Sequence, residues 1–486
     1  MAEFLLLVGT YTRREPHVAG NAEGIYTYRF NTDDGTLHHV ATAAGIKNPS
    51  FLTTDTARNT VYAVSEIADL DGGRTGAVAS FALDQATGTL QPLNTVRSQG
   101  AGPCYVAVDG TGACVLVANY GSGTVALLPI TEGGALGEAT ATFQHQFQPG
   151  AGGINTARQE APHAHSITLD PDNRYALAAD LGTDELRVYA VDPSVPTMAP
   201  QTTVALTPGA GPRHIAFHPN GVWLYVINEL DSTVTLCDYA ADTGAVTPRQ
   251  RISTLPADFD GANTCADIHV HPSGQFVYGS NRGHDSIAVF TVDPATGAVD
   301  GGGPRPPRAH AAQLHVESGR TVLLAANQDT GDVVVFRIGA ATGGLTPIHR
   351  PHSLPRLPAP ARLTAGETWP PMDTDKHGLN SRNTDVSPLF LLLYPCLSVS
   401  IRGSALFCSS RSLNHRARGC LQDCDFDLVA KDHLLHARRK LVAPRVVLVR
   451  GGVQRFLLCL ALETPDPHVE IGILRRQKAP RITIRT

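Results

Sequence analysis

Two kinds of short apolar run alternate along the first three quarters of the chain. The first kind ends in a small or polar residue, as in VYAVSE from Val61 and LYVINE from Leu224. The second kind often leads into a turn of the type TG-x-L, as in AVASFALDQATGTL from Ala77. Short apolar runs bounded by Gly, Asn and Asp are typical of β-strands joined by tight turns. The pattern therefore predicts an all-β protein.

The pair of runs occurs seven times. The second run begins at residues 24, 77, 124, 185, 233, 286 and 332, so the spacing is 46 to 61 residues. Periods of about 40–50 residues with several strands per unit are typical of β-propellers. We therefore predict a seven-bladed β-propeller over residues 1–365, followed by a C-terminal extension over residues 366–486.

A further strand should precede each pair, and we call it the lead strand. It is expected at six places, near Pro49, Pro103, Pro162, Pro212, Cys265 and Arg308. The N-terminal pair has no lead strand before it, so a segment after Thr346 should close the ring. The segment that follows is HRPHSLPRLPAPARL, residues 349–363, and it is the expected donor. Its four prolines fit poorly, because proline cannot donate a hydrogen bond to a neighbouring strand.

The repeat stops at Gly366. Residues 366–486 contain no TG-x-L turn and hold five of the nine cysteines. They form either a small appended domain or non-native translated sequence without a packed core, and we expect the second. Zinc-type residues occur there, but their spacing matches no common zinc pattern, so we predict no metal. These residues are Cys420, Cys424, His433 and His436.

Charge and composition exclude several classes of partner. Residues 1–365 carry 21 Lys+Arg and 33 Asp+Glu, a net charge of −12, which argues against binding to nucleic acid. The odd number of cysteines predicts no disulfide framework and favours the reducing cytoplasm. FLLLVG near the start is too short for a secretion signal. The longest apolar run, PLFLLLYPCLSV, is broken by Pro395 and is shorter than the roughly 18 residues of a membrane helix.

Two equivalent positions of the repeat carry ionisable residues. In an antiparallel pair the start of one strand lies beside the end of the next, and in a propeller both positions face one mouth of the central channel. The position at the start of the lead strand holds Ser50, Cys104, His165, Arg213 and Ala266. The position at the end of the next strand holds Glu66, Tyr120, Leu181, Glu229 and Arg282. We predict that His165, Arg213, Glu229 and Arg282 converge from three consecutive blades.

These four residues are a plausible hydrolytic set. A neutral His165 can take a proton from water near pH 7. Arg213 and Arg282 can bind a carboxylate or a phosphate, and one of them can stabilise an oxyanion. Glu229 can orient an arginine or act as a second base. The alternative is that Arg213 and Glu229 form a structural ion pair that ties two strands together.

Other residues invite functional interpretations that we set aside. His163-x-His165 and His269-x-His271 have the spacing of paired metal ligands on a strand, but no Asp/Glu cluster accompanies them. Ser166 follows His165 and should point to the opposite face, which disfavours a serine nucleophile. Cys104 is expected to be a small core residue. We therefore predict no metal and no cofactor.

Several phrases resemble the bacterial lactonase family of seven-bladed β-propellers. They are VGTYT, APHAHSITLDPDNRY, GPRHIAFHPNG, SNRGHDSIAVF and LLAANQDTGDVVVFRI, and the resemblance covers about residues 4–347. The family includes the propeller-type 6-phosphogluconolactonases and is related to the fungal carboxy-cis,cis-muconate cyclase. Its proposed site uses a histidine of HAHS and the arginine of PRH. It also uses the glutamate of NE and the arginine of NRG, so the four correspond to His165, Arg213, Glu229 and Arg282.

The resemblance implies metal-independent hydrolysis of 6-phosphogluconolactone in the oxidative pentose phosphate pathway. Two other functions stay open. The same site could serve a carboxymuconate-type lactone cyclase or cycloisomerase, which also needs arginines for carboxylates. The propeller could instead be a non-catalytic binding scaffold, although the blades do not show the repeated GH and WD dipeptides that WD repeats carry in each blade. The expected partner is a small phosphorylated or carboxylated lactone, without nucleic acid or membrane.

Overall fold

The computed structural model describes most of the first 348 residues and several short segments beyond them. The described residues are 3–15, 18–147, 153–301, 311–316, 321–327, 331–348, 352–353, 389–392, 444–451 and 455–462. The chain forms two compact units, Met1–Ser398 and Val399–Thr486. The predicted boundary between residues 365 and 366 falls outside the described residues and stays a prediction.

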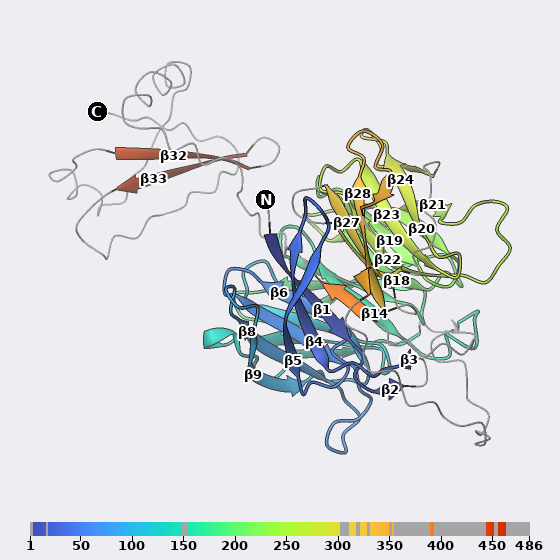
Figure 1. The fold of residues 1–486 in the computed structure, drawn as a ribbon. Helices are drawn as coiled ribbons and strands as arrows, with labels where there is room; N and C mark the ends of the chain where they lie inside the picture. The colour runs from blue at the N-terminus through green and yellow to red at the C-terminus, as the bar shows by residue number, and fades with distance from the viewer. Residues whose placement is uncertain are drawn as a thin grey trace. The chain divides into compact units, whose positions relative to one another are not determined.

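Seven antiparallel sheets follow one another along the first unit, each on a path of four neighbouring strands (Figure 1). The innermost strands are β31 (Leu389–Leu392), β6 (Leu52–Asp55), β10 (Pro103–Val108), β14 (Ala164–Leu169), β18 (Pro212–Phe217), β22 (Thr264–Val270) and β26 (Ala311–Val316). The second strands are β1 (Glu3–Thr10), β7 (Thr60–Ser65), β11 (Cys114–Asn119), β15 (Tyr175–Asp180), β19 (Trp223–Asn228), β23 (Phe276–Arg282) and β27 (Val322–Asn327). The all-β seven-bladed propeller is therefore confirmed.

The two outer strands complete each blade. The third strands are β4 (Gly24–Asn31), β8 (Ala77–Leu83), β12 (Thr124–Pro129), β16 (Glu185–Asp192), β20 (Thr233–Ala240), β24 (Ser286–Val292) and β28 (Asp332–Ile338). The outermost strands are β5 (Leu37–Ala44), β9 (Leu90–Arg97), β13 (Ala141–Gln144), β17 (Thr197–Ala205), β21 (Ala245–Ser253), β25 (Val299–Gly301) and β29 (Leu345–Pro347). Minor elements are β2 (Arg14–Glu15), β3 (Val18–Ala19), β30 (His352–Ser353) and a 3-10 turn at Glu132–Gly134. The third strands begin at the seven predicted residues.

The burial of each strand explains whether its sequence is apolar or polar. The second strands β7, β11 and β19 are buried along their whole length. Strands that are covered on both faces need apolar residues at nearly every position. The outermost strand β17 is mostly exposed and correspondingly polar. The TG-x-L turns that precede the outermost strands place glycine in the left-handed region, for example Gly88 at φ 74° and Gly244 at φ 71°.

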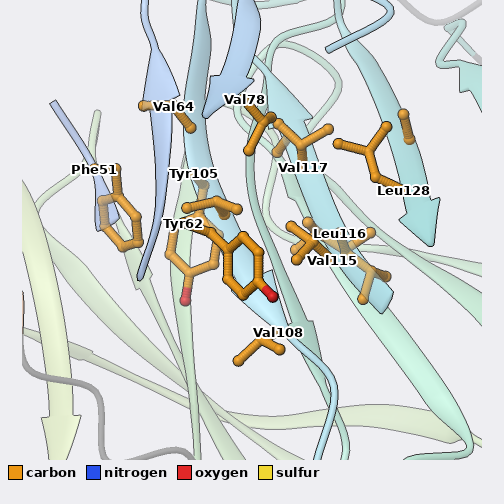
Figure 2. Packing of buried hydrophobic residues seen from close by; sticks show 14 of the residues in the cluster. Phe51, Tyr62, Val64, Val78, Tyr105, Val108, Val115, Leu116, Val117 and Leu128 are labelled. Atoms are coloured by element: carbon orange, nitrogen blue, oxygen red, sulfur yellow. The ribbon is translucent and has the colours of Figure 1, made fainter. Parts of the chain in front are cut away.

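Adjacent blades pack through large apolar side chains. Figure 2 shows the cluster around Phe51, Tyr62, Tyr105 and neighbouring valines, which joins blades two and three. The rings of Phe51 and Tyr105 lie 4.3 Å apart between centroids. Full burial of one such side chain contributes about 1.5–3 kcal/mol. This packing fixes the blades against one another and so gives the innermost strands a rigid support.

The innermost strands form a closed ring. Each contacts the innermost strand of the next blade, and β31 contacts both β26 and β6. β31 pairs antiparallel with β1, with Leu7 opposite Leu392 and Thr10 opposite Leu389. Closure by strands from both termini is therefore confirmed.

The donor of the closing strand differs from the prediction. Within the predicted segment 349–363, only His352–Ser353 is described, and it pairs with β28 rather than with β1. The sequence LFLL of β31 can offer consecutive backbone donors, whereas the proline-rich segment cannot. A strand about forty residues further along the chain thus takes the place expected for residues 349–363.

Truncation should reveal this closing strand. A chain that ends at Ser398 keeps β31, and we expect it to melt at the temperature of the full-length protein. A chain that ends at Ala365 leaves β1 without its partner, and we expect a melting temperature lower by about 3–5 °C. Calorimetry of the three chains measures the difference. Equal melting temperatures for the two truncated chains would contradict the assignment.

The second unit contains a hairpin of β32 (Pro444–Gly451) and β33 (Arg455–Leu462). The zinc-type residues Cys420, Cys424, His433 and His436 lie outside the described residues, as does most of the predicted extension. No helix in the described part of the chain is long and apolar enough to cross a membrane.

Candidate active site

A β-bulge marks the start of most innermost strands. The pairing with the second strand skips Cys104 in β10, His165 in β14 and Arg213 in β18, and β22 and β26 carry similar irregularities. A bulge leaves one residue out of the ladder and turns its side chain away from the regular alternation. The ionisable residues at the starts of the innermost strands therefore point where a regular strand would not place them.

The four predicted residues converge on the Glu229 carboxylate. Arg213 Nε donates to Glu229 Oε2 at 2.8 Å, and Arg282 Nη2 lies 3.2 Å from Glu229 Oε1. His165 Nε2 lies 3.6 Å from Oε2. Only 2% of Glu229 is exposed. The ion pair of the structural alternative, between Arg213 and Glu229, is therefore present, and Glu229 also contacts residues of two further blades.

A third arginine joins this set. Arg158 Nη2 donates to Glu229 Oε1 at 2.8 Å and to the Tyr120 hydroxyl at 3.2 Å. Arg158 comes from the long connection between β13 and β14 rather than from a blade strand. We call Glu229, His165, Arg158, Arg213 and Arg282 the Glu229 cluster. Sequence reasoning missed Arg158 because it has no counterpart in the repeat.

Charge fixes the protonation states of the cluster. Burial alone would raise the pKa of Glu229, but Arg282, Arg158 and Arg213 outweigh it and hold that pKa well below the usual value. Burial, together with the charge of Arg213, lowers the pKa of His165 well below 6.5. The carboxylate is therefore ionised at neutral pH while the imidazole is neutral. Of the two predicted roles for Glu229, the geometry favours orientation of arginines over action as a base.

His214, which is itself bonded to Asp267, holds Arg213 from the other side. Arg213 Nη1 donates to His214 Nε2 at 3.2 Å and to the backbone oxygen of Ala266. His214 Nδ1 in turn donates to Asp267 Oδ1 at 2.7 Å. Burial, then the charge of Arg213, lowers the pKa of His214 to about 4. The ring is therefore neutral at neutral pH, and its Nε2 can accept the hydrogen bond from Arg213. Arg213 is thus held in one orientation by Glu229 and His214 together.

Comparison with known proteins places this site in a family. Residues 5–358 match the family model described as "Lactonase, 7-bladed beta-propeller". The chain belongs to this lactonase family. The 6-phosphogluconolactonase of Bacillus subtilis is 35% identical to this chain over 363 residues, which cover 73% of this chain and 97% of the relative.

Solved structures agree with this assignment. A putative 6-phosphogluconolactonase from Bacteroides uniformis is 34% identical to this chain with a TM-score of 0.66, over 73% of this chain and 97% of that one. The periplasmic gluconolactonase PpgL of Pseudomonas aeruginosa is 29% identical with a TM-score of 0.65, over 73% and 97% of the two chains. The expected resemblance to bacterial lactonases is therefore confirmed.

Two of the other equivalent positions of the repeat hold Cys104 and Glu66. Cys104, expected in the core, is half-buried, and its Sγ lies 3.8 Å from His165 Nδ1 and 3.3 Å from the His165 backbone oxygen. Glu66 accepts a hydrogen bond from Tyr11 at 2.6 Å and another from Ser50. Burial raises the pKa of Glu66 to about 7. The predicted pairing of strand starts with strand ends is therefore observed in a second blade.

The histidine pairs have separate partners. His163 Nδ1 lies 2.9 Å from the backbone oxygen of Tyr120, and its ring stacks on Tyr120 at 4.4 Å between centroids. His269 Nε2 lies 3.1 Å from Asp267, whereas His271 Nδ1 lies 2.8 Å from Ser273 Oγ. Among the described residues, no group of three or more His, Cys, Asp or Glu could hold a metal ion. The buried Ser166 hydroxyl has no hydrogen-bond partner among the residues that the structure describes.

Proposed function

We propose that this lactonase hydrolyses 6-phosphogluconolactone to 6-phosphogluconate without a metal or cofactor. The observation that carries the proposal is a neutral, buried His165 beside an ionised Glu229 that gathers three arginines. The relatives named 6-phosphogluconolactonase support this choice of substrate. The site assignments His165, Arg213, Glu229 and Arg282 are part of the proposal.

The proposed reaction uses His165 as a general base. Its neutral ring takes a proton from water while the water oxygen bonds to the lactone carbonyl carbon. Arg213 stabilises the oxyanion that forms as the carbonyl π electrons move to oxygen. The intermediate collapses, the bond from the carbonyl carbon to the ring oxygen breaks, and the ring oxygen takes the proton from His165. The product is an open-chain acid that ionises in water.

The charge of the site suits an anionic substrate. Three arginines and one ionised glutamate leave a net charge of +2 in the Glu229 cluster, since His165 is neutral. Guanidinium groups form paired hydrogen bonds with phosphate and carboxylate oxygens. A lactone that carries a phosphate and opens to a carboxylate fits this excess of positive charge.

The direct test is ring opening of freshly prepared 6-phosphogluconolactone, with and without a chelator. We expect the protein to accelerate opening well above the buffer rate and the chelator to leave the rate unchanged. A rate equal to buffer would refute the proposal, and loss of the rate with chelator would refute its metal-free form. Product analysis with a carboxymuconate substrate tests the cyclase alternative. The cytoplasmic location stays a prediction, which cell fractionation can test.

A further inference from the structure

The two oxygens of Glu229 divide the cluster into halves. Oε2 faces Arg213 Nε at 2.8 Å and His165 Nε2 at 3.6 Å. Oε1 faces Arg158 Nη2 at 2.8 Å and Arg282 Nη2 at 3.2 Å. The base therefore shares an oxygen with one arginine, while the other two arginines share the opposite oxygen. This division separates the group that acts on water from a pair of cations with no base beside it.

The Oε1 half holds more positive charge than its protein partners balance. Two guanidinium groups meet at one carboxylate oxygen, and their side chains are only 6% and 10% exposed. Burial lowers the pKa of Arg282, and the nearby charges of Arg213 and Arg158 lower it further, against the effect of Glu229. Glu229 Oε1 lies between the two guanidinium groups, but a single carboxylate that also pairs with Arg213 cannot balance both of their charges. The remaining positive charge therefore favours the binding of an anionic ligand.

Both arginines of this half also keep an unused donor. The buried Nε atoms of Arg158 and Arg282 have no hydrogen-bond partner among the described residues. A buried hydrogen-bond donor without a partner destabilises the fold by about 1–3 kcal/mol. Two such donors in one cluster therefore need an explanation. Arg187 also has an unpartnered Nε, but Glu185 at 2.6 Å balances its charge one to one. Within the part of the chain that the structure describes, only the Arg158–Arg282 pair combines unused donors with excess charge.

We propose that Arg158 and Arg282 form an anion subsite that holds the phosphate group of the substrate, while His165 and Arg213 act on its carbonyl. The inference rests on the proposed function and deepens it. A phosphate monoester carries close to two negative charges at neutral pH, which matches the +2 excess of the cluster. Arg158 then acts as a specificity residue, because it supplies half of the subsite from a connection outside the blade repeat.

The test compares a phosphorylated with an unphosphorylated ligand in the full-length protein. Arg158→Lys keeps the charge but loses the planar pair of donors. We expect it to raise KM for 6-phosphogluconolactone about 10- to 100-fold while KM for glucono-1,5-lactone changes less than threefold. Arg187→Lys is the matched control, since Arg187 is a similarly enclosed arginine with a single carboxylate partner. It should leave both KM values unchanged.

Binding of the stable products gives a second measurement that does not depend on catalysis. Calorimetry should show that the wild-type protein binds 6-phosphogluconate at least tenfold more tightly than gluconate. Arg158→Lys and Arg282→Lys should each remove that preference, and two variants guard against misfolding of one. If the protein opens lactones but neither variant changes the preference, the subsite assignment is wrong and the function stands. If the preference exists without lactone opening, the subsite stands and the proposed function is wrong.

Discussion

Replacement of Glu229 by glutamine should reduce kcat/KM for the lactone at least about 100-fold. The amide has the shape of the carboxylate but no charge, so it cannot hold Arg213, Arg158 and Arg282 together. The amide nitrogen of the glutamine would also face one of these arginines, at a position where a Glu229 carboxylate oxygen now accepts a hydrogen bond. Arg213 would lose the bond at 2.8 Å that sets its orientation beside His165. Steady-state kinetics with freshly prepared substrate measures the loss.

The same change should also destabilise the fold. Three buried arginines would face each other with no anion between them, and breaking a buried ion pair by removal of one partner costs about 3–5 kcal/mol. Equilibrium unfolding in urea measures this change. Glu185→Gln is the matched control, because Glu185 is also buried and Arg187 is its single ion-pair partner among the described residues. We expect it to keep wild-type kcat/KM. Activity within threefold of wild type in Glu229→Gln would show that the cluster has no part in the reaction.

Alignment of the repeats predicted which residues of the site meet. It placed Arg213 opposite Glu229 and put His165 and Arg282 on neighbouring blades. That success has a physical cause. Strands buried on both faces must be apolar throughout, so an ionisable residue at their ends is conspicuous. The starts of the third strands were equally readable, because in most blades only a short loop separates them from the second strand. Most of the fold could therefore be predicted from the periodic pattern of buried apolar residues.

Other features had no periodic signal. Arg158 lies in the connection that makes one spacing 61 residues long, and that excess length was the only sign of an addition at this point. The bulges that redirect Cys104 and His165 change the pairing by one residue and leave the apolar pattern almost intact. The closing strand β31 lies beyond the point where the repeat stops, so the spacing of the repeat did not predict its position. Each of these depends on long-range pairing rather than on local pattern.

His165→Gln should lower kcat about 10²- to 10⁴-fold, the usual contribution of a general base. Glutamine can keep a polar contact with Glu229 Oε2, now 3.6 Å from His165 Nε2, but it cannot take a proton from water. The Arg158–Arg282 pair contacts the other oxygen, so KM for the phosphorylated lactone should change little. His271→Gln is the matched control, since His271 is also buried but bonds within a turn at Ser273.

The pH dependence of the wild-type protein tests the same role without a substitution. Burial and the charge of Arg213 lower the pKa of His165 well below 6.5, so the neutral, base-competent form persists as pH falls through 6.5. We therefore expect kcat/KM, corrected for spontaneous opening, to stay level from pH 7.5 to about pH 6 and to fall only in more acidic buffer. A midpoint at 6.5 would mean that the reacting imidazole is solvated, which the enclosed His165 is not. Because Glu229 is already ionised throughout this range, its carboxylate adds no step to the profile. Glu66, with a pKa of about 7, and His214, with a pKa of about 4, also titrate near the site, and the phosphate of the substrate titrates near pH 6. The profile is therefore measured with unphosphorylated glucono-1,5-lactone, and the part of the acidic limb that is missing in His165→Gln reports on His165.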